Sequence, residues 1–165
     1  MNESGYNTKL IPALDFMRID EDKAADLGFI RKNIKNVLTD LNEVDYYITQ
    51  GFICRNSQNE IDNLQRGGSD YTASLVGAAI DAEEIQIWPD IDGFHNNVPR
   101  FVENTKKIEQ LSFNEAAELA YFGAKILHPL TVLPARVHNI PVRLKNTMNP
   151  TDSGTLITSD SDGKG

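Results

Sequence analysis

Residues 61–88, IDNLQRGGSDYTASLVGAAIDAEEIQIW, decide the fold, because they predict a strand, a helix and a second strand in direct succession. The first four residues are rich in strand formers, and the pair Gly67-Gly68 opens a helix that we expect to end near residue 82. Residues 84–88 alternate between polar and apolar side chains, which predicts the second strand. This order is typical of α/β domains with largely parallel sheets.

The N-terminal side of this unit adds one helix and several short strands. An apolar stripe at helical spacing predicts a helix with the inward side chains Leu27, Ile30, Ile34, Val37 and Leu41. We expect Asp20 or Asp22 to cap this helix. Residues 46–49 and 52–54 predict strands, and with residues 61–64 they form a hairpin or a strand with a long turn. Residues 10–14 predict a short strand, and their proline suggests that it lies at an edge.

The C-terminal side continues the alternation of helix and strand. Ser112 and Glu115 have the spacing of a capping box and start a helix that runs toward Gly123. Pro129 suits the first turn of a further short helix. Residues 140–145 and 154–158 predict two more strands. We therefore expect an α/β fold, a three-layer αβα sandwich with a mainly parallel sheet, over residues 1–158, followed by a polar tail at 159–165.

The composition excludes several classes of protein. The 165 residues are 40% hydrophobic and carry a formal net charge of −8, so their surface repels the phosphates of nucleic acids. The single cysteine, Cys54, forms no internal disulfide, which suits a reducing compartment. The longest apolar stretch, residues 73–80, is too short to span a membrane, and the first residues have no signal-peptide pattern. We expect a cytoplasmic protein without nucleic-acid or membrane partners.

Three clusters are candidates for chemistry. In the first, Arg66-Gly67-Gly68-Ser69-Asp70, paired glycines let backbone amides approach an anion at a helix N-terminus, and an arginine can grip a carboxylate or phosphate. A plain turn with a capping serine explains this spacing equally well. The second cluster, residues 88–100, follows a strand, where ligands bind in open α/β sheets. The third places Lys125 between two helices. Taken alone, a turn-rich loop and a solvated lysine explain these two clusters better.

Other reactive residue types favour structural explanations. Cys54 fits a small apolar core residue better than a nucleophile. His128 and His138 have no partner at metal-ligand spacing, so we assign no metal site. Residues 160–165 imitate the start of a calcium loop, but no glutamate ligand follows within the chain, and we interpret them as tail.

Taken together, the sequence resembles the aspartate kinases of the amino-acid kinase family. The matching stretches are ITQGFI (48–53), RGGSDYTA (66–73), DIDG (90–93), PR (99–100), ELAYFGAKILHP (118–129) and GTLI (154–157). They occur in the family's order and spacing over roughly residues 43–158. The first and third clusters favour aspartate kinases over acetylglutamate, glutamate or uridylate kinases.

The resemblance implies transfer of the γ-phosphoryl group of ATP to the side-chain carboxylate of L-aspartate, the first step toward lysine, threonine and methionine. It implies that Arg66, Gly67, Gly68 and Ser69 bind aspartate, and that Asp70 positions catalytic ammonium groups. Lys125 is implied to be catalytic and to contact the ATP phosphates, and Mg²⁺ to arrive with ATP. The implied nucleotide-binding residues are Pro89, Asp90, His95, Arg100, Lys125 and Ile126.

Some features depart from the family. Pro89 replaces a usual threonine, Val98 an acidic residue and His95 a common tyrosine. Nothing like the family's Lys-Phe-Gly-Gly phosphate loop precedes Leu10, and the paired regulatory domains are absent. We therefore interpret the chain as the C-terminal part of an aspartate kinase catalytic domain, inactive alone, insensitive to lysine or threonine, and prone to form homo-oligomers through an exposed sheet edge. The alternative is a non-catalytic binding or assembly module; a kinase for another small acid fits the first cluster less well.

Overall fold

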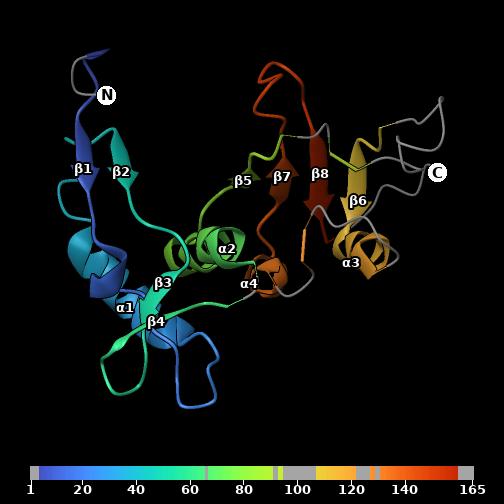
Figure 1. Cartoon of the computed structure of the whole chain (residues 1–165). Helices are drawn as coiled ribbons and strands as arrows, with labels where there is room; N and C mark the ends of the chain where they lie inside the picture. The colour runs from blue at the N-terminus through green and yellow to red at the C-terminus, as the bar shows by residue number, and fades with distance from the viewer. Residues whose placement is uncertain are drawn as a thin grey trace. The chain divides into compact units, whose positions relative to one another are not determined.

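The computed structural model describes residues 4–65, 67–90, 93–94, 107–121, 127–128 and 131–159. The chain divides into two compact units, residues 1–80 and 81–165 (Figure 1). The first unit contains β1 (Thr8–Leu10), the 3-10 helix η2 (Ala13–Asp15), α1 (Leu27–Val37), β2 (Tyr46–Ile48), β3 (Ile53–Arg55), β4 (Ile61–Asn63) and α2 (Gly68–Ile80). The second contains β5 (Ile85–Ile87), β6 (Gln110–Ser112), α3 (Phe113–Tyr121), α4 (Leu133–Val137), β7 (Val142–Leu144) and β8 (Thr155–Thr158).

Helix α1 begins at a different cap from the one expected. The carboxylate of Asp26 accepts the backbone N–H of Phe29 at 3.0 Å, so Asp26 is the N-cap. The prediction of Asp20 or Asp22 is wrong, because the Asp20 carboxylate accepts the N–H of Ala24 at 2.9 Å and closes a turn before the helix. Several acidic residues precede the apolar stripe, and spacing alone did not separate a turn-closing aspartate from a helix-capping one.

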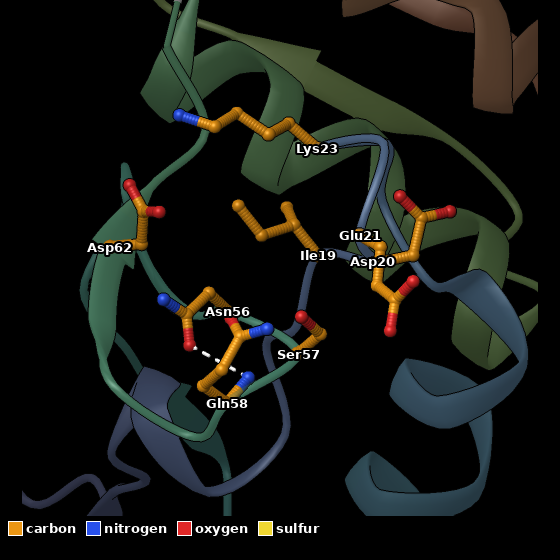
Figure 2. A pocket seen from close by; sticks show the side chains of 8 residues that line it. All are labelled: Ile19, Asp20, Glu21, Lys23, Asn56, Ser57, Gln58 and Asp62. Carbon is orange, nitrogen blue, oxygen red and sulfur yellow. Dashed lines mark hydrogen bonds between the residues drawn. The ribbon is translucent and has the colours of Figure 1, made fainter.

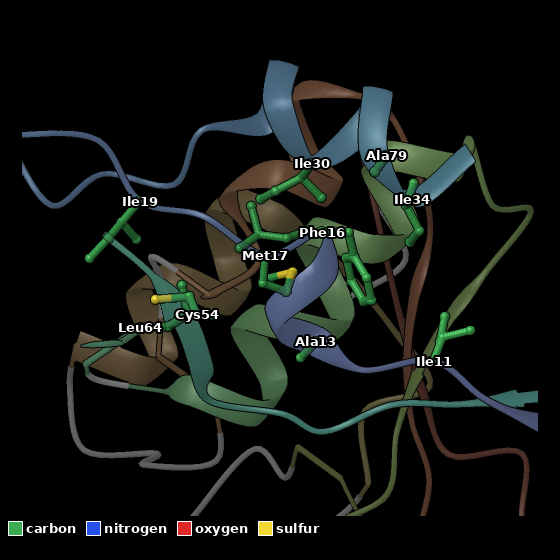
Figure 3. Close-up of a cluster of buried hydrophobic side chains, with 11 residues drawn as sticks. Ile11, Ala13, Phe16, Met17, Ile19, Ile30, Ile34, Cys54, Leu64 and Ala79 are labelled. Carbon is green, nitrogen blue, oxygen red and sulfur yellow. The ribbon is translucent and has the colours of Figure 1, made fainter. Parts of the chain in front are cut away.

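A hydrophobic core fills the first unit, between α1, α2 and the segment that follows β1 (Figure 3). Its buried members are Ile11, Ala13, Phe16, Met17, Ile19, Ile30, Ile34, Cys54, Leu64, Leu75 and Ala79. The apolar stripe of α1 is confirmed at Ile30 and Ile34, but the helix ends at Val37 and leaves Leu41 exposed. The strand expected at residues 10–14 ends at Leu10, because Pro12 leads into η2, whose turn directs apolar side chains into the core.

The first unit contains two small sheets. β1 and β2 pair in parallel, with Leu10 opposite Ile48, and β3 and β4 form an antiparallel hairpin, the first of the two predicted alternatives. Helix α2 follows the hairpin and packs against α1. Its N-terminus therefore lies directly after the β4 strand, at residues 67–70.

The described residues of the second unit form a four-stranded sheet in the order β5-β7-β8-β6 (Figure 1). β5 pairs with β7 in parallel, as does β6 with β8, whereas β7 and β8 are antiparallel. The capping box is confirmed: the Ser112 N–H donates to the Glu115 carboxylate at 2.7 Å, and the Glu115 N–H donates to Ser112 Oγ at 3.1 Å. Strand β6, which ends at this serine, had not been predicted.

The α/β fold with mainly parallel strand pairs is confirmed. The short helix near the third cluster is α4, which starts at Leu133 and has Pro134 in its first turn; Pro129 lies outside the described residues. None of the helices in the described part of the chain is long and apolar enough to cross a membrane.

Candidate functional site

The structure describes about half of the predicted site residues. Gly67, Gly68, Ser69 and Asp70 lie at the start of α2 in the first unit, and Pro89 and Asp90 follow β5 in the second. Arg66, His95, Arg100, Lys125 and Ile126 lie outside the described residues. The described site residues of each unit are therefore considered separately.

The start of α2 is shaped by two glycines. Gly67 has a φ of +72°, a left-handed conformation that favours glycine, and its carbonyl accepts the N–H of Tyr71 at 2.8 Å. Gly68 is buried, and a Cβ there would lie 2.0 Å from the Phe52 ring. Any side chain at position 68 would have to displace this ring. The two glycines are therefore required by backbone conformation and by close packing, which a plain surface turn would not require.

The turn between β2 and β3 presses against this helix start. Phe52 has a φ of +76°, a strained conformation for a residue with a side chain. Its N–H donates to the Thr72 hydroxyl at 3.0 Å, and that hydroxyl donates to the Gly68 carbonyl at 2.8 Å. A Cβ on Gly51 would lie 2.8 Å from Ser69 Oγ. The segments 51–52 and 67–72 therefore form one closely packed structure, called here the turn–helix junction.

Sequence reasoning missed the role of Phe52 and Thr72 in this junction. Phe52 keeps an exposed part of its ring at the helix start while its backbone is held at both ends, because its carbonyl also accepts the N–H of Leu64 at 2.8 Å. Strained residues that neighbouring hydrogen bonds hold in place concentrate at ligand-binding sites. The available signal was the matching stretch at residues 48–53, which had been used for recognition only.

Asp70 is the charged residue of the junction. It lies in the first turn of α2, and burial raises the pKa of its carboxyl above the usual range. A carboxylate that burial disfavours becomes stable when a cation approaches it. This environment suits a residue that positions ammonium groups, the role that the resemblance implies.

In the second unit, the segment after β5 is fixed to the segment after β7. The Pro89 carbonyl accepts both the N–H of Thr147, at 2.8 Å, and its hydroxyl, at 2.6 Å. The Lys145 ammonium lies 4.9 Å from the centre of the Trp88 ring. Because β5 and β7 are parallel, both segments lie at the carboxyl edge of the sheet, where α/β proteins bind ligands. Lys145, which the sequence had placed within a strand, thus adds a cation over the Trp88 ring at this edge.

Comparison with known proteins gives the family. The family model described as "Amino acid kinase family" matches residues 1–146. The chain belongs to the amino acid kinase family. Within it, the chain is 47% identical over 168 residues to aspartokinase 3, chloroplastic, of Arabidopsis thaliana, covering 98% of the chain and 30% of that protein. It is 46% identical over 121 residues to the lysine-sensitive aspartokinase 3 of Escherichia coli, covering 73% of the chain and 27% of that protein.

Solved structures place this amino acid kinase chain close to the same relatives. E. coli aspartokinase III in complex with aspartate and ADP matches with a TM-score of 0.87 and 35% identity, covering 98% of the chain and 37% of that structure. A UMP kinase from Bacillus anthracis matches at a TM-score of 0.63 and 17% identity, which shows the shared fold alone. The resemblance to aspartate kinases is confirmed, and the chain spans less than two fifths of the length of these three aspartate kinase relatives.

An open pocket of about 390 Å³ lies elsewhere in the first unit (Figure 2). It is lined by Ile19, Asp20, Glu21, Lys23, Asn56, Ser57, Gln58 and Asp62. Its lining contains none of the predicted site residues of this amino acid kinase. Three carboxylates and one lysine give it acidic character, which does not suit ATP or aspartate.

Cys54 is not a nucleophile in this fold. It is fully buried on β3, and burial, assisted by the nearby charge of Asp62, raises the pKa of its thiol to about 11. The interpretation of Cys54 as a small apolar core residue is confirmed. In the described ranges, no group of three His, Cys, Asp or Glu side chains forms a metal site.

Proposed function

We propose that this chain is part of an aspartate kinase that transfers the γ-phosphoryl group of ATP to the side-chain carboxylate of L-aspartate. The observation that carries the proposal is the turn–helix junction, in which Phe52 and Gly68 are in close contact at the helix start that begins the aspartate-binding motif. The relative solved with aspartate and ADP has the same fold at 35% identity. The chain's own kinase activity, its substrates and its partners belong to this proposal.

The chemistry requires positive charge rather than a base. The attacking carboxylate is already an anion, so the site must hold two anions together and stabilise charge on the transferring group. We assign Arg66 and the backbone at Gly67, Gly68 and Ser69 to the substrate carboxylate, where the N-terminus of α2 favours an anion. Burial disfavours the charged form of Asp70, and we assign this carboxylate to hold ammonium groups in position.

The nucleotide side of the proposal lies at the carboxyl edge of the second sheet. Pro89, Asp90, His95, Arg100, Lys125 and Ile126 are assigned to ATP, which enters as its Mg²⁺ complex. Lys125 is assigned to neutralise the phosphates, and Lys145, beside Trp88, supplies a further cation at the same edge. Two lysines near one triphosphate would compensate in part for Pro89, which has no N–H to donate.

We further propose that the chain alone lacks phosphoryl transfer, that it resides in the cytoplasm, and that it forms a homo-oligomer by itself. The domain assignment of residues 1–158 with a tail at 159–165 belongs to the same proposal. The buried, unpaired thiol of Cys54 supports a reducing compartment. Sedimentation velocity of the purified chain tests the oligomeric state directly.

A hydroxylamine trapping assay tests the function. The chain is incubated with Mg-ATP and L-aspartate, and any aspartyl phosphate is trapped and measured. We expect no product, but saturable aspartate binding in calorimetry that Arg66→Ala abolishes. Arg136→Ala, which removes an exposed arginine from α4, is the matched control and leaves binding unchanged. Aspartate-dependent product would overturn the expected inactivity, and loss of aspartate binding in the folded wild-type chain would overturn the substrate assignment.

A non-catalytic binding or assembly module is the second candidate. It is favoured by Pro89, which lacks an amide donor and whose carbonyl is already bonded to Thr147. Titration with Mg-ATP distinguishes the two candidates. Binding of nucleotide favours the kinase piece, whereas aspartate binding without nucleotide binding favours the module.

A further inference from the structure

The hydroxyl of Thr72 links the two halves of the turn–helix junction. Thr72 lies one turn into α2, and only 4% of the residue is exposed. Its Oγ1 donates to the Gly68 carbonyl at 2.8 Å and accepts the N–H of Phe52 at 3.0 Å. A hydroxyl has one proton to donate, so the bond to Gly68 fixes its rotation and leaves its lone pairs for Phe52. One buried oxygen therefore connects the helix start with the turn before β3.

Phe52 depends on this bond because its backbone is strained. Its φ of +76° lies in the left-handed region, which residues with a side chain rarely adopt. The Phe52 carbonyl accepts the N–H of Leu64 at 2.8 Å, so Leu64 holds one side of the residue and the Thr72 hydroxyl holds the other. Of these two bonds, only the one to Thr72 is made by a side chain. A single substitution can therefore remove it without changing the backbone.

The position of Phe52 in turn limits where the helix start can lie. A Cβ at Gly68 would lie 2.0 Å from Phe52 Cδ2, and a Cβ at Gly51 would lie 2.8 Å from Ser69 Oγ. Residues 51 and 52 thus pack directly against residues 68 and 69. The backbone at residues 67–69 is the part assigned above to the substrate carboxylate. Hydrogen-bond donors that are fixed in advance bind an anion more tightly than donors that must reorganise.

We propose that Thr72 is a positioning residue for aspartate binding, which sets the affinity for the substrate without touching it. Its hydroxyl holds Phe52 in the left-handed conformation, and Phe52 and Gly51 hold the helix start in the shape that receives the aspartate carboxylate. The inference rests on the proposed function, because that function assigns the helix start to aspartate. It adds to the assigned residues a buried side chain whose hydroxyl is hydrogen-bonded within the protein.

A purely structural hydroxyl is the competing explanation. Threonines inside helices often donate to the carbonyl four residues earlier, and that bond alone does not indicate a ligand. The bond from Phe52 distinguishes Thr72, because it comes from a strained residue on another segment. Thr155 of the second unit offers the comparison. Its hydroxyl is also buried, donates to the Ile108 carbonyl at 2.7 Å and accepts the N–H of Phe94 at 3.2 Å.

The test is the binding of L-aspartate to the chain, measured by calorimetry. Thr72→Val keeps the shape of the side chain but leaves the Phe52 N–H without its partner. It should weaken aspartate binding by about tenfold, the change in Kd that corresponds to one lost hydrogen bond. Thr72→Ser keeps the hydroxyl and should bind aspartate within about twofold of the wild type. Thr155→Val removes an equivalent pair of bonds from the second unit and should leave aspartate affinity unchanged.

Hydrogen exchange of the free chain gives a second measurement that needs no ligand. In Thr72→Val the Phe52 amide should exchange at least about tenfold faster than in the wild type, because its hydrogen bond is gone. The amides of the β3–β4 pair should keep their rates. In Thr72→Ser the Phe52 amide should exchange as in the wild type. A hydroxyl with only a structural role would lower stability in both valine variants without a selective change in aspartate affinity.

Urea unfolding shows whether each variant is folded at the temperature of the titration, and Thr72→Ala takes the place of Thr72→Val if the valine variant is not. The proposal is overturned if Thr72→Val binds aspartate as the wild type does, if Thr155→Val weakens binding equally, or if Thr72→Ser does not preserve it. Absence of aspartate binding in the folded wild-type chain would instead overturn the substrate assignment. The exchange rate of the Phe52 amide, measured without ligand, separates these two failures.

Discussion

The pairs β1–β2 and β5–β7 have the same length and direction, but their environments are opposite. Each consists of two three-residue strands in parallel register. In the second unit Val142 and Leu144 of β7 are completely buried, whereas in the first unit Leu10 of β1 is 63% exposed. The alternating apolar residues are similar in both pairs. Strand pattern alone therefore does not determine burial.

The difference arises from neighbours. β7 lies between β5 and β8, so both of its edges are paired. β1 and β2 have only one another among the described strands. Burial of an apolar strand contributes to stability only when other elements cover it, at roughly 25 cal/mol per Å² removed from water. The comparison thus separates a strand pair whose apolar side chains are buried from one whose apolar side chains stay exposed.

The largest expected effect comes from truncating a leucine in each pair. Leu144→Ala should lower the free energy of unfolding by about 2–5 kcal/mol, because it leaves a cavity in a buried strand. Leu10→Ala should change it by less than about 0.5 kcal/mol, the usual range for a surface site. Urea unfolding followed by circular dichroism and by the single tryptophan, Trp88, measures both. Equal losses would show that the Leu10 side chain is covered in solution.

The second effect tests whether the close packing at the turn–helix junction stabilises the first unit. Gly68→Ala should destabilise by about 1–3 kcal/mol, because its Cβ would meet the Phe52 ring. Gly28→Ala in α1 is the matched control: its Cβ would have only an ordinary contact, 3.6 Å from Asp26 Oδ1. That change should be neutral or stabilise by up to about 1 kcal/mol. Thermal unfolding compares the two, and a neutral Gly68→Ala would refute the packing argument.

The spacing of residues along the chain predicted most helices and strands, but few of the contacts between them. The stripe of α1, the β3–β4 hairpin and the Ser112–Glu115 box were predicted because each depends on residues a few positions apart. The contact between Phe52 and Gly68 depends on how a hairpin folds back on a helix, and the cation beside Trp88 depends on strand pairing. Neither has a periodic signal in the sequence.

Errors in prediction came from similar residues in competing roles. Asp20 and Asp26 are both plausible caps by residue type, and only the chain path assigned the second to α1. β6 was missed because its three residues run directly into the capping box of α3. The site residues were assigned by family likeness, and their roles remain predictions.

A third effect tests whether the hydrophobic core of the first unit, which contains Cys54, is dry. Burial raises the pKa of the Cys54 thiol from 9.0 to about 11, so the native state holds this proton more tightly than the unfolded state. The stabilisation is complete below pH 9 and is lost as pH rises through about 11, amounting to roughly 1–2 kcal/mol once the shift in pKa is reduced for solvent screening. Unfolding measured from pH 8 to 11 should show this decline, and Cys54→Ala should lack that part of it. Rapid reaction of the native thiol with a disulfide reagent at pH 8 would contradict a dry interior.

The smallest effect concerns two carboxylates of the first unit, Asp70 at the turn–helix junction and Asp40 beside β1. Burial raises the pKa of Asp70, so its charged form at pH 7 disfavours the native state, and Asp70→Asn should raise stability by roughly a few tenths of a kcal/mol after solvent screening. The gain should vanish at pH 3, where the carboxyl is protonated. Asp40, beside β1, has its pKa lowered by hydrogen bonds from Thr39 and Lys9 and by the Lys9 charge, so Asp40→Asn should act in the opposite direction at pH 7. Paired urea titrations at pH 7 and pH 3 measure both signs. A loss of stability in Asp70→Asn would show that a cation already compensates this carboxylate, and that the junction is organised before any substrate binds.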